Sequence, residues 1–257
     1  MSYLKRVLLL LLFALSVIVP AKAMAYNEDS RIHFEALFQV LDRDIEEEET
    51  EFLGESFPST TTSAQSLRLL GKLSIQVIDP IEIYGLIGGS DLEIDDFGFS
   101  SDFEAAYGAG TRVILFRERD PRMPYQVFVD YHFLKVKVDD TVNFSPDIVD
   151  ASGNIIELTN ENVREEIDWL EQVIKFGVMG RHYEFEPYGG VQFSLVSGDD
   201  RIHSQAQRLD LDLKNDDTFG IFLGTLYYLT PSDRAALFIE GSLFDQYSLT
   251  GGIRVGF

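Results

Sequence analysis

The chain has 257 residues and a formal net charge of −22. This charge argues against a general nucleic-acid-binding role, because the phosphate backbone would be repelled. Cysteine is absent, which excludes disulfides, thiol catalysis and thiolate metal sites. Hydrophobic residues make up 45% of the chain, so it is not a disordered protein, and its many glycine, phenylalanine and tyrosine residues are typical of strands with an aromatic belt.

The first residues have the features of an export signal. Lys5 and Arg6 precede an apolar run over 7–19, and small residues follow around Ala23 and Ala25. This is the order of a Sec-type signal peptide, and its apolar run is too short for a comfortable membrane span. Cleavage after either alanine fits the pattern. With cleavage after Ala25, the chain divides into a signal peptide at 1–25 and one domain at 26–257.

Ten further segments alternate apolar and polar residues with a period of two, which predicts strands with one apolar face. The first, Ser30–Leu41, also fits an amphipathic helix, and nine strands would then remain. In the fifth, the alternation slips near Leu134, which predicts a bulge or a barrel rim there. The segments are 30–41, 67–77, 81–88, 103–115, 125–133, 169–181, 191–195, 219–227, 237–243 and 247–257.

The connections between these segments alternate in length. Short turns are expected at 78–80, 117–124, 182–187 and 229–234, and long, mostly acidic loops at 42–65, 89–101, 139–163 and 197–216. The last connection, near Asp245, is tight although a long one would be due there. A soluble sandwich would have shorter strands and no such asymmetry of its loops.

The last segment ends on an aromatic residue. Thr250, Gly252, Val255 and Phe257 follow the order polar residue, glycine, apolar residue, terminal aromatic residue. Together with the signal peptide and the alternating loops, this order resembles the C-terminal assembly signal of bacterial outer-membrane β-barrel proteins of the OmpA-like or small porin-like kind.

The resemblance implies an all-β fold, namely an antiparallel up-and-down transmembrane β-barrel with ten strands, or eight as the alternative. It also implies export to the bacterial outer membrane, contact with outer-membrane lipid and lipopolysaccharide, and delivery by the barrel-assembly machinery. Because open sheet edges are not tolerated in lipid, the sheet must close on itself.

Charged residues on the polar face of the strands are balanced in number. An unpaired ion in a narrow lumen would cost several kcal/mol, so a lumen charge network is predicted. His132 would join it beside Asp130, and Arg254 would pair with an acid such as Glu240. The acids are Glu35, Glu82, Glu104, Asp130, Glu171 and Glu240, and the bases are Arg68, Lys72, Arg112, Lys175, Arg181 and Arg254.

Such a network in a ten-stranded barrel predicts a narrow or filled lumen. The expected function is therefore a structural or surface-interaction role, with a small-solute, porin-like pore as the alternative.

The long loops carry many acids, including Glu46, Glu47, Glu48 and Glu49. A solvated surface explains these acids. A Ca²⁺ or Mg²⁺ site is the sharper hypothesis, although no stretch has EF-hand spacing, and no other cofactor is expected.

A surface hydrolase is the third alternative. Ten-stranded proteases of the omptin family use an aspartate pair and an Asp/His pair at the loop rim. This chain has Asp95 and Asp96 in one loop, and Asp199, Asp200 and His203 in another. Adjacent aspartates are expected in loops this acidic, and the four histidines form no Ser/His/acid pattern. The sequence therefore favours a protein without enzymatic activity.

Overall fold

The computed structural model describes residues 31–47, 50–52, 55–57, 60–94, 99–118, 124–144, 147–149, 155–157, 161–203, 208–229 and 234–257. The expected signal peptide at 1–25 lies outside these ranges. The described residues form strands and turns, and none of them belongs to a helix that could cross a membrane.

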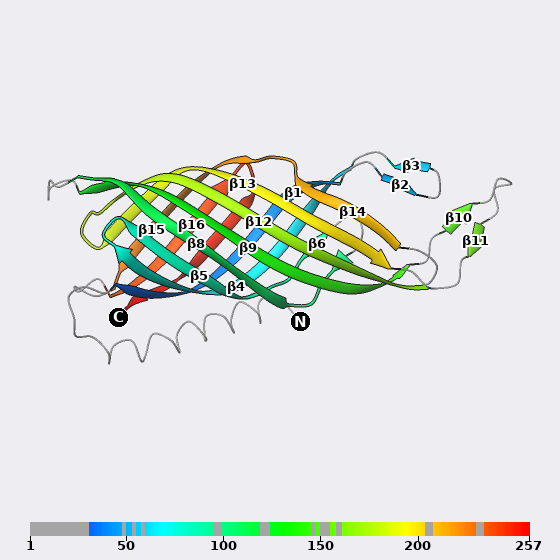
Figure 1. Ribbon diagram of the computed structural model, residues 1–257, viewed down its shortest axis with the longest axis horizontal. Helices are drawn as coiled ribbons and strands as arrows, with labels where there is room; N and C mark the ends of the chain where they lie inside the picture. Colours follow the sequence, from blue (N-terminus) through cyan, green and yellow to red (C-terminus); the bar gives the residue numbers. More distant parts are fainter. Residues whose placement is uncertain are drawn as a thin grey trace.

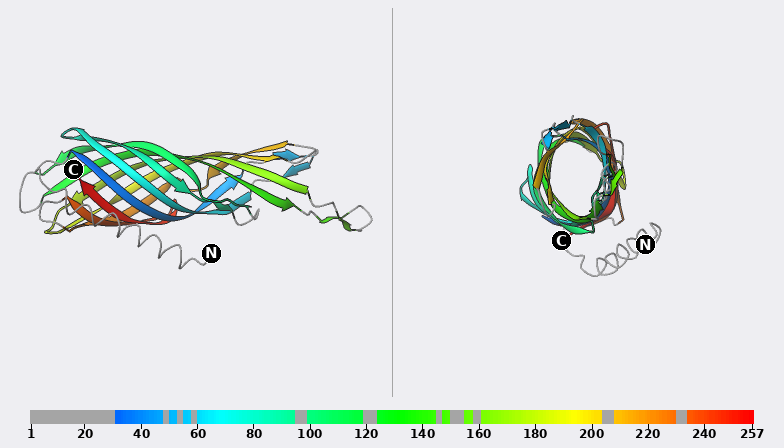
Figure 2. Two further views of the ribbon diagram at one scale, coloured as in Figure 1. Left: turned by 90° about the horizontal axis from the view of Figure 1, so that it is seen from below. Right: turned by 90° about the vertical axis from the view of Figure 1, so that its right-hand side faces the viewer.

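Ten long strands close into a ring in which each strand pairs antiparallel with its neighbour in the chain (Figure 1). The first ring strand, β1, pairs with β4 on one side and with the last strand, β17, on the other. The view along the long axis shows the closed ring (Figure 2). Its strands are β1 (Ile32–Glu47), β4 (Thr60–Ile78), β5 (Ile81–Ser90), β8 (Glu104–Arg117), β9 (Tyr125–Phe144), β12 (Glu161–Gly180), β13 (Phe185–His203), β15 (Phe219–Tyr228), β16 (Ala235–Leu243) and β17 (Tyr247–Gly256).

Shorter strands are added at the end of the ring where the long connections lie. Three of them join the same 13-stranded sheet: β6 (Glu93–Ile94), β7 (Phe99–Ser100) and β14 (Arg208–Asn215). Two separate hairpins lie at the tips, β2 (Thr50–Phe52) with β3 (Glu55–Phe57), and β10 (Asp147–Val149) with β11 (Ile155–Glu157).

The first ring segment is a strand over Ile32–Glu47, so the helical alternative for it is wrong. Its pairing explains why: Phe38 lies opposite Gly251 of β17 and opposite Leu69 of β4, so both edges of β1 are hydrogen-bonded. A helix at this place would leave two open sheet edges, and unpaired edge groups are costly in an apolar environment.

Three of the predicted long loops are wrong over much of their length, because strands continue into them. β1 runs to Glu47 and β4 begins at Thr60, β9 and β12 extend to Phe144 and from Glu161, and β13 and β14 pair as far as His203 and Arg208. The short connection at 79–80 lies where it was predicted, whereas 185–187 of the predicted turn 182–187 already belong to β13. Most of the other two predicted turns, 119–123 and 230–233, lies outside the described residues.

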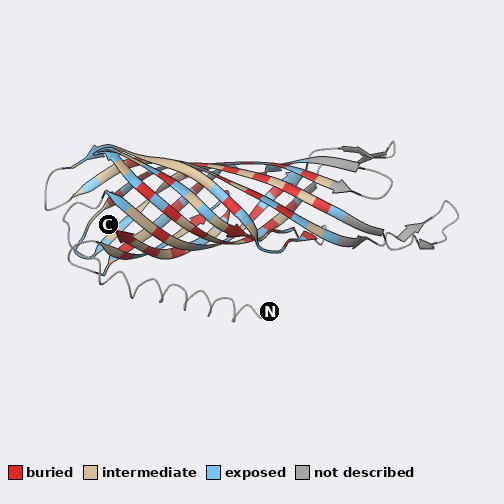
Figure 3. Cartoon of the chain, turned by 60° about the horizontal axis from the view of Figure 1, so that its bottom comes forward, coloured by how far each residue is buried: buried red, intermediate tan, exposed pale blue. Residues whose placement is uncertain are grey.

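The ring consists of two tiers that differ in which face is apolar. Figure 3 colours the strands by burial, and buried residues alternate with more exposed ones along them. In the belt, the outward residues are apolar, as at the exposed Phe38 and Val40 of β1. In the cap, the outward residues of the same strand become the exposed Asp44 and Glu46. We define the belt as 32–41, 66–78, 81–90, 104–117, 125–134, 170–180, 185–196, 219–228, 235–243 and 247–256, and the cap as the described residues of 42–47, 60–65, 93–94, 99–100, 135–144, 161–169, 197–203 and 208–215.

The inward face changes in the opposite sense at the same level. On β9 the outward residue is the half-buried Phe133 in the belt and the exposed Lys137 in the cap, while the inward Val136 and Val138 are buried. The pairing of β9 with β8 and with β12 keeps its register through Leu134, so the bulge, one of the two predicted alternatives, is wrong. Leu134 lies instead at the boundary between belt and cap. The sequence changes because the surroundings of the outer face change, and not because the backbone slips.

The cap has a hydrophobic core of its own. β14 bridges β1 and β13 at this level, where the ring strands β15, β16 and β17 have ended, and β6 pairs with β4. Trp169, with 3% of its surface exposed, lies inside this core and not at a rim. The buried cluster consists of Ile45, Ala64, Ile94, Phe99, Val136, Val138, Ile167, Trp169 and Leu213 of the cap, together with Leu92 and the adjoining belt residues Leu70, Ala106, Leu134 and Val196.

Candidate functional site

The belt encloses a polar cavity of about 160 Å³. Its wall includes inward residues from every strand of the ring, because alternate side chains of a closed sheet point inward. Charged groups of β1, β4, β8, β9, β12, β16 and β17 line the cavity, and apolar groups such as Phe128, Met179 and Phe222 form a second buried cluster. Most of the predicted network residues line this cavity or contact a residue that does.

Glu35 is the centre of the first group of ion pairs. It is 6% exposed and lies 2.7 Å from the Arg254 guanidinium and 3.6 Å from Lys72 Nζ. Both contacts follow from strand register, since Glu35 is directly opposite Arg254 on β17 and Lys72 on β4. Lys72 is also 4.0 Å from Glu82. The predicted pairing of Arg254 with Glu240 is therefore wrong, because β1 brings a nearer acid to Arg254.

Asp130 is the centre of the second group. Its carboxylate accepts hydrogen bonds from Arg112 Nε at 2.8 Å and from the Tyr84 hydroxyl at 2.5 Å. His132 Nδ1 lies 3.8 Å away on the same strand. Asp130 is 3% exposed, so these partners replace the water that the buried carboxylate has lost.

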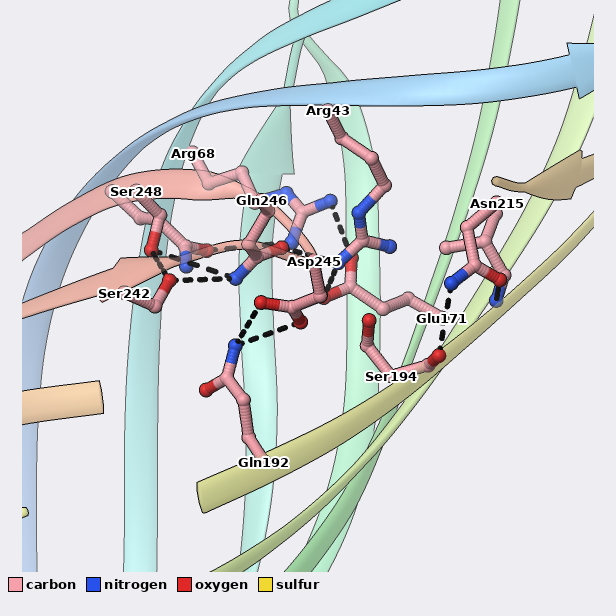
Figure 4. A network of polar contacts seen from close by, with 12 residues as sticks. Arg43, Arg68, Glu171, Gln192, Ser194, Asn215, Ser242, Asp245, Gln246 and Ser248 are labelled. Atoms are coloured by element: carbon pink, nitrogen blue, oxygen red, sulfur yellow. Dashed lines mark hydrogen bonds and ion pairs between the residues drawn. The ribbon is translucent and has the colours of Figure 1, made fainter. Parts of the chain in front are cut away.

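Glu171 is the centre of the third group, directly below the cap core. It pairs with Arg68 at 2.8 Å and with Arg43 at 3.5 Å (Figure 4). Arg43 also donates a hydrogen bond to Gln246 Oε1. Arg43 is not among the predicted network residues, because it stands among acids in the predicted loop 42–65.

The β16–β17 turn supplies a further buried contact that the sequence did not indicate. Gln192 Nε2 donates to both oxygens of Asp245, at 2.9 and 2.8 Å. The turn is tight, and Phe244 in it has a φ of 84°, a strained value for a residue with a side chain. The tight turn therefore directs Asp245 and Gln246 inward, where they join the upper end of the network.

Lys175 and Glu240 pair across the cavity at 2.5 Å, and Lys175 Nζ lies 5.0 Å from the centre of the Phe222 ring. Two other predicted members lie elsewhere. Glu104 is the first residue of β8 and does not line the cavity. Arg181 follows the end of β12, where its Nε donates to the Tyr183 carbonyl oxygen and its guanidinium stacks on Tyr228.

The aspartates of the hydrolase hypothesis do not converge. Asp199 and Asp200 are adjacent on β13, so they point to opposite faces: Asp199 is exposed beside Arg201, and Asp200 is buried. Asp95, Asp96 and the side chain of His203 lie outside the described residues. In the belt, Ser74 is directly opposite His33, but Ser74 is fully buried and does not line the cavity.

The acidic candidates for a cation site are only partly described. Glu46 is exposed at the end of β1, whereas the side chain of Glu47, and Glu48 and Glu49 entirely, lie outside the described residues. Within the described part of the chain, no three metal-ligating side chains come together in a group that could hold a metal ion.

The residues of the C-terminal signal occupy both faces of β17. Thr250 lines the cavity, and Gly252 lies so close to the Ala36 carbonyl oxygen that a Cβ atom would be 2.3 Å from it. Val255 is buried on the outer face, and Phe257 is 54% exposed. The Phe257 amide donates to the Ile32 carbonyl oxygen at 2.9 Å, so the chain end is held against β1.

No protein-family model matches the chain, and no curated protein matches it by sequence. By structure it is similar to the outer membrane protease OmpT from Escherichia coli, with a TM-score of 0.53 at 14% identity over 92% of this chain and 100% of OmpT. The translocator domain of the autotransporter NalP from Neisseria meningitidis has a TM-score of 0.45 at 10% identity over 93% of each chain. The transport unit of AIDA-I from Escherichia coli has a TM-score of 0.41 at 6% identity over 95% and 97%. The likeness to OmpT establishes the fold, and the chain is an antiparallel β-barrel of the kind found in outer-membrane proteins.

Proposed function

We propose that the protein is an integral β-barrel of the bacterial outer membrane whose interior is closed and whose cap stands outside the bilayer as a structural or interaction surface. Two features support the location. The belt exposes apolar residues all around, including Leu223 at 72% and Ile87 at 73%, and a water-soluble protein rarely exposes so large an apolar surface. A lipid-facing apolar band around a polar interior is the arrangement of transmembrane barrels.

The observation that carries the closed interior is the hydrophobic core of the cap. Ile45, Val138, Ile167 and Phe99 have no exposed surface, which supports a barrel axis that is filled by side chains at this level. Below this core, the Glu171 group ties β1, β4 and β12 together across the lumen. The remaining cavity of about 160 Å³ suits a small number of water molecules and not a continuous path for solutes.

Conductance in planar bilayers tests this proposal. We expect no steady conductance from the folded protein. Trp169→Ala removes the single tryptophan from the cap core and should increase brief openings, whereas Leu195→Ala, a matched truncation on the outer face of β13, should leave the trace unchanged. A large and reproducible steady conductance from the unchanged protein would refute the closed interior and favour the small-solute pore.

Location is tested separately, by outer-membrane fractionation and by the gel-mobility shift on heating that folded barrels display. Removal of Phe257 should reduce delivery to the outer membrane, because the C-terminal signal would be lost.

Release of peptides from a surface-exposed substrate, abolished by His203→Ala, would instead support the hydrolase alternative. Lipopolysaccharide and divalent cations stay proposed partners of the outer surface, with the acids 46–49 as the candidate cation ligands.

A further inference from the structure

Two arginines of the belt, Arg112 on β8 and Arg254 on β17, line the cavity with hydrogen-bond donors to spare. A guanidinium carries five N–H donors. Arg112 Nε donates to Asp130, and Arg254 Nε and Nη2 both lie 2.7 Å from one oxygen of Glu35. Among the described residues, Arg112 Nη1 and Nη2 and Arg254 Nη1 have no hydrogen-bond partner. These nitrogen atoms keep accessible surface, whereas the unpaired Nε and Nη1 of Arg43 are fully buried.

The two guanidinium groups are more open to the cavity than the acids that they bind. The accessible fraction of the side chain is 21% for Arg112 and 16% for Arg254, against 4% for Asp130 and 9% for Glu35. The carboxylates therefore lie behind the guanidinium groups. A molecule inside the cavity meets the positive charge of these pairs first.

The wall of the cavity has a small excess of positive charge. Its most open acid, Glu240, is already bound by Lys175 Nζ at 2.5 Å. The lysines and arginines of the wall are Arg68, Lys72, Arg112, Lys175 and Arg254, and its acids are Glu35, Asp130, Glu171 and Glu240. Five bases against four acids favour an anion over a cation as the occupant.

Three of these bases surround the same part of the cavity. Lys72 Nζ lies 3.6 Å from Glu35, which also binds Arg254. Arg112 and Arg254 are close enough for their charges to repel each other. An anion between them would relieve this repulsion and accept from their free donors.

We propose that the cavity binds one small inorganic oxyanion of the phosphate or sulfate kind between the guanidinium groups of Arg112 and Arg254, with Lys72 as a third positive charge. The planar fork of a guanidinium matches two oxygens of such an anion. Both arginines have donors left for this contact, so their pairs with Asp130 and Glu35 stay intact.

The size and the position of the cavity fit this ligand. One water molecule needs about 10–15 Å³ of such space, so a cavity of about 160 Å³ has room for an oxyanion and several water molecules. Glu35 and Arg254 lie close to the ends of β1 and β17 at the short turns, far from the cap core. The anion would therefore enter from the end of the short turns, and the core would still close the other end.

Calorimetric titration of the folded full-length chain with sulfate, in detergent micelles, tests the site. The ionic strength is kept constant with sodium chloride, so that general screening by salt does not change. We expect one saturable site per chain with a dissociation constant of about 1 mM or lower, and competition by inorganic phosphate. No saturable binding of either oxyanion, or equal binding of chloride, would overturn the proposal.

Three conservative variants locate the site. Arg112→Lys and Arg254→Lys keep a positive charge beside each carboxylate but lose the free fork, and each should weaken sulfate binding by about tenfold. Arg68→Lys is the matched control. Arg68 lines the same cavity, but its Nη atoms donate to Gln39 and Glu171 and its free Nε is buried, so affinity should stay the same. Equal weakening in all three variants, or none in the first two, would contradict the assignment.

If these variants do not fold, nuclear magnetic resonance of the unchanged protein decides. Saturating sulfate should shift the backbone amide resonances around Arg112 and Arg254 and leave those of the cap in place. Shifts confined to the cap would reject the site.

The outcome is separable from that of the proposed function. A steady conductance together with sulfate binding would refute only the closed interior, and a silent barrel that binds no oxyanion would refute only the site.

Discussion

The belt and the cap contain several of the same strands but place their side chains in opposite ways. On β12, the inward residues Lys175 and Glu171 carry charge in the belt, whereas Trp169 and Ile167 are apolar in the cap. The outward residues change from Phe176 to Glu166 over the same distance. The strand does not change its geometry, so the comparison isolates the effect of the medium outside it. Where the outside is apolar, charge is kept inside as paired ions, and where the outside is water, the apolar groups move inside.

The same comparison explains why the two tiers are stabilised differently. The cap gains free energy by burying apolar surface, at roughly 25 cal/mol per Å². In the belt that term would be small at the proposed location, because lipid is as apolar as the residues that would face it. Its interior depends on hydrogen bonds and on ion pairs that must be complete, since a buried ion without a partner is strongly destabilising.

The largest expected effect comes from breaking a belt group at its shared acid. Glu171→Gln leaves Arg43 and Arg68 buried without their counter-charge, and should lower the free energy of unfolding by about 3–5 kcal/mol. Denaturant unfolding in micelles measures it. Asp79→Asn is the matched control, because Asp79 faces Arg117 at 3.8 Å in an exposed turn and the exchange there should cost less than about 1 kcal/mol. Equal effects at the two positions would contradict the ion-pair role.

The next largest effect is expected from a charge placed on the outer face, which should cost more stability in the belt than in the cap. Leu223→Lys puts an ammonium on the exposed apolar surface of the belt and should cost about 2–4 kcal/mol in a bilayer. Asp44→Lys places the same side chain on the outer face of the cap, where water solvates it, and should change stability by less than about 0.5 kcal/mol. Unfolding in lipid vesicles compares the pair. A similar cost at both positions would mean that the boundary between belt and cap is misplaced.

The smallest expected effect concerns the ion pairs on the outside of the cap. Arg164 and Asp139 are 3.2 Å apart, and their side chains are 60% and 46% exposed. Arg164→Ala should therefore cost about 0.2–1 kcal/mol, and less at high salt. A double-mutant cycle with Asp139→Ala measures the coupling. A coupling as large as that of the Glu171 group would show that the outer surface of the cap is less solvated than its exposure indicates.

The belt could be predicted from the sequence because one rule describes it: apolar residues alternate outward, and charged residues alternate inward. That rule located all ten ring strands and ten of the twelve charges proposed for the lumen, with Glu104 and Arg181 as the exceptions. It could not supply the partners of these charges. Arg254 contacts Glu35 because ring closure pairs β17 with β1. Lys175 contacts Glu240 because its side chain reaches across the cavity. Neither contact can be predicted from the sequence of a single strand.

The cap was missed because its strands keep the period of two while the faces exchange roles. The segment 41–46 reads Leu, Asp, Arg, Asp, Ile, Glu, which alternates correctly but has acids where the belt has apolar residues. Its many acids favour a loop, so Arg43, which lies in this segment, is not predicted as a member of the charge network. The clearest signal of this exchange in the sequence lies on β9, where Leu134, Val136 and Val138 alternate with Lys135 and Lys137. The same pattern also fits a slip in the phase of the alternation. The contact of Asp245 with Gln192 depends on a strained turn and had no signal in the sequence.

The exchange of faces at residue 134 also sets a rule for which substitutions the chain tolerates. Along β9, the odd-numbered positions hold apolar residues as far as Phe133, and the charged Lys135, Lys137 and Asp139 follow. The even-numbered positions change in the opposite sense around residue 134, from Asp130 and His132 to Leu134, Val136 and Val138. A map of the substitutions tolerated at each position should therefore show alternating apolar and polar positions along the whole strand. At one residue, the apolar positions change from the outer face to the inner face. If the belt lies in the outer membrane as proposed, this residue marks the edge of the bilayer, and the depth to which the barrel is immersed can be read from the sequence of each strand that crosses that edge.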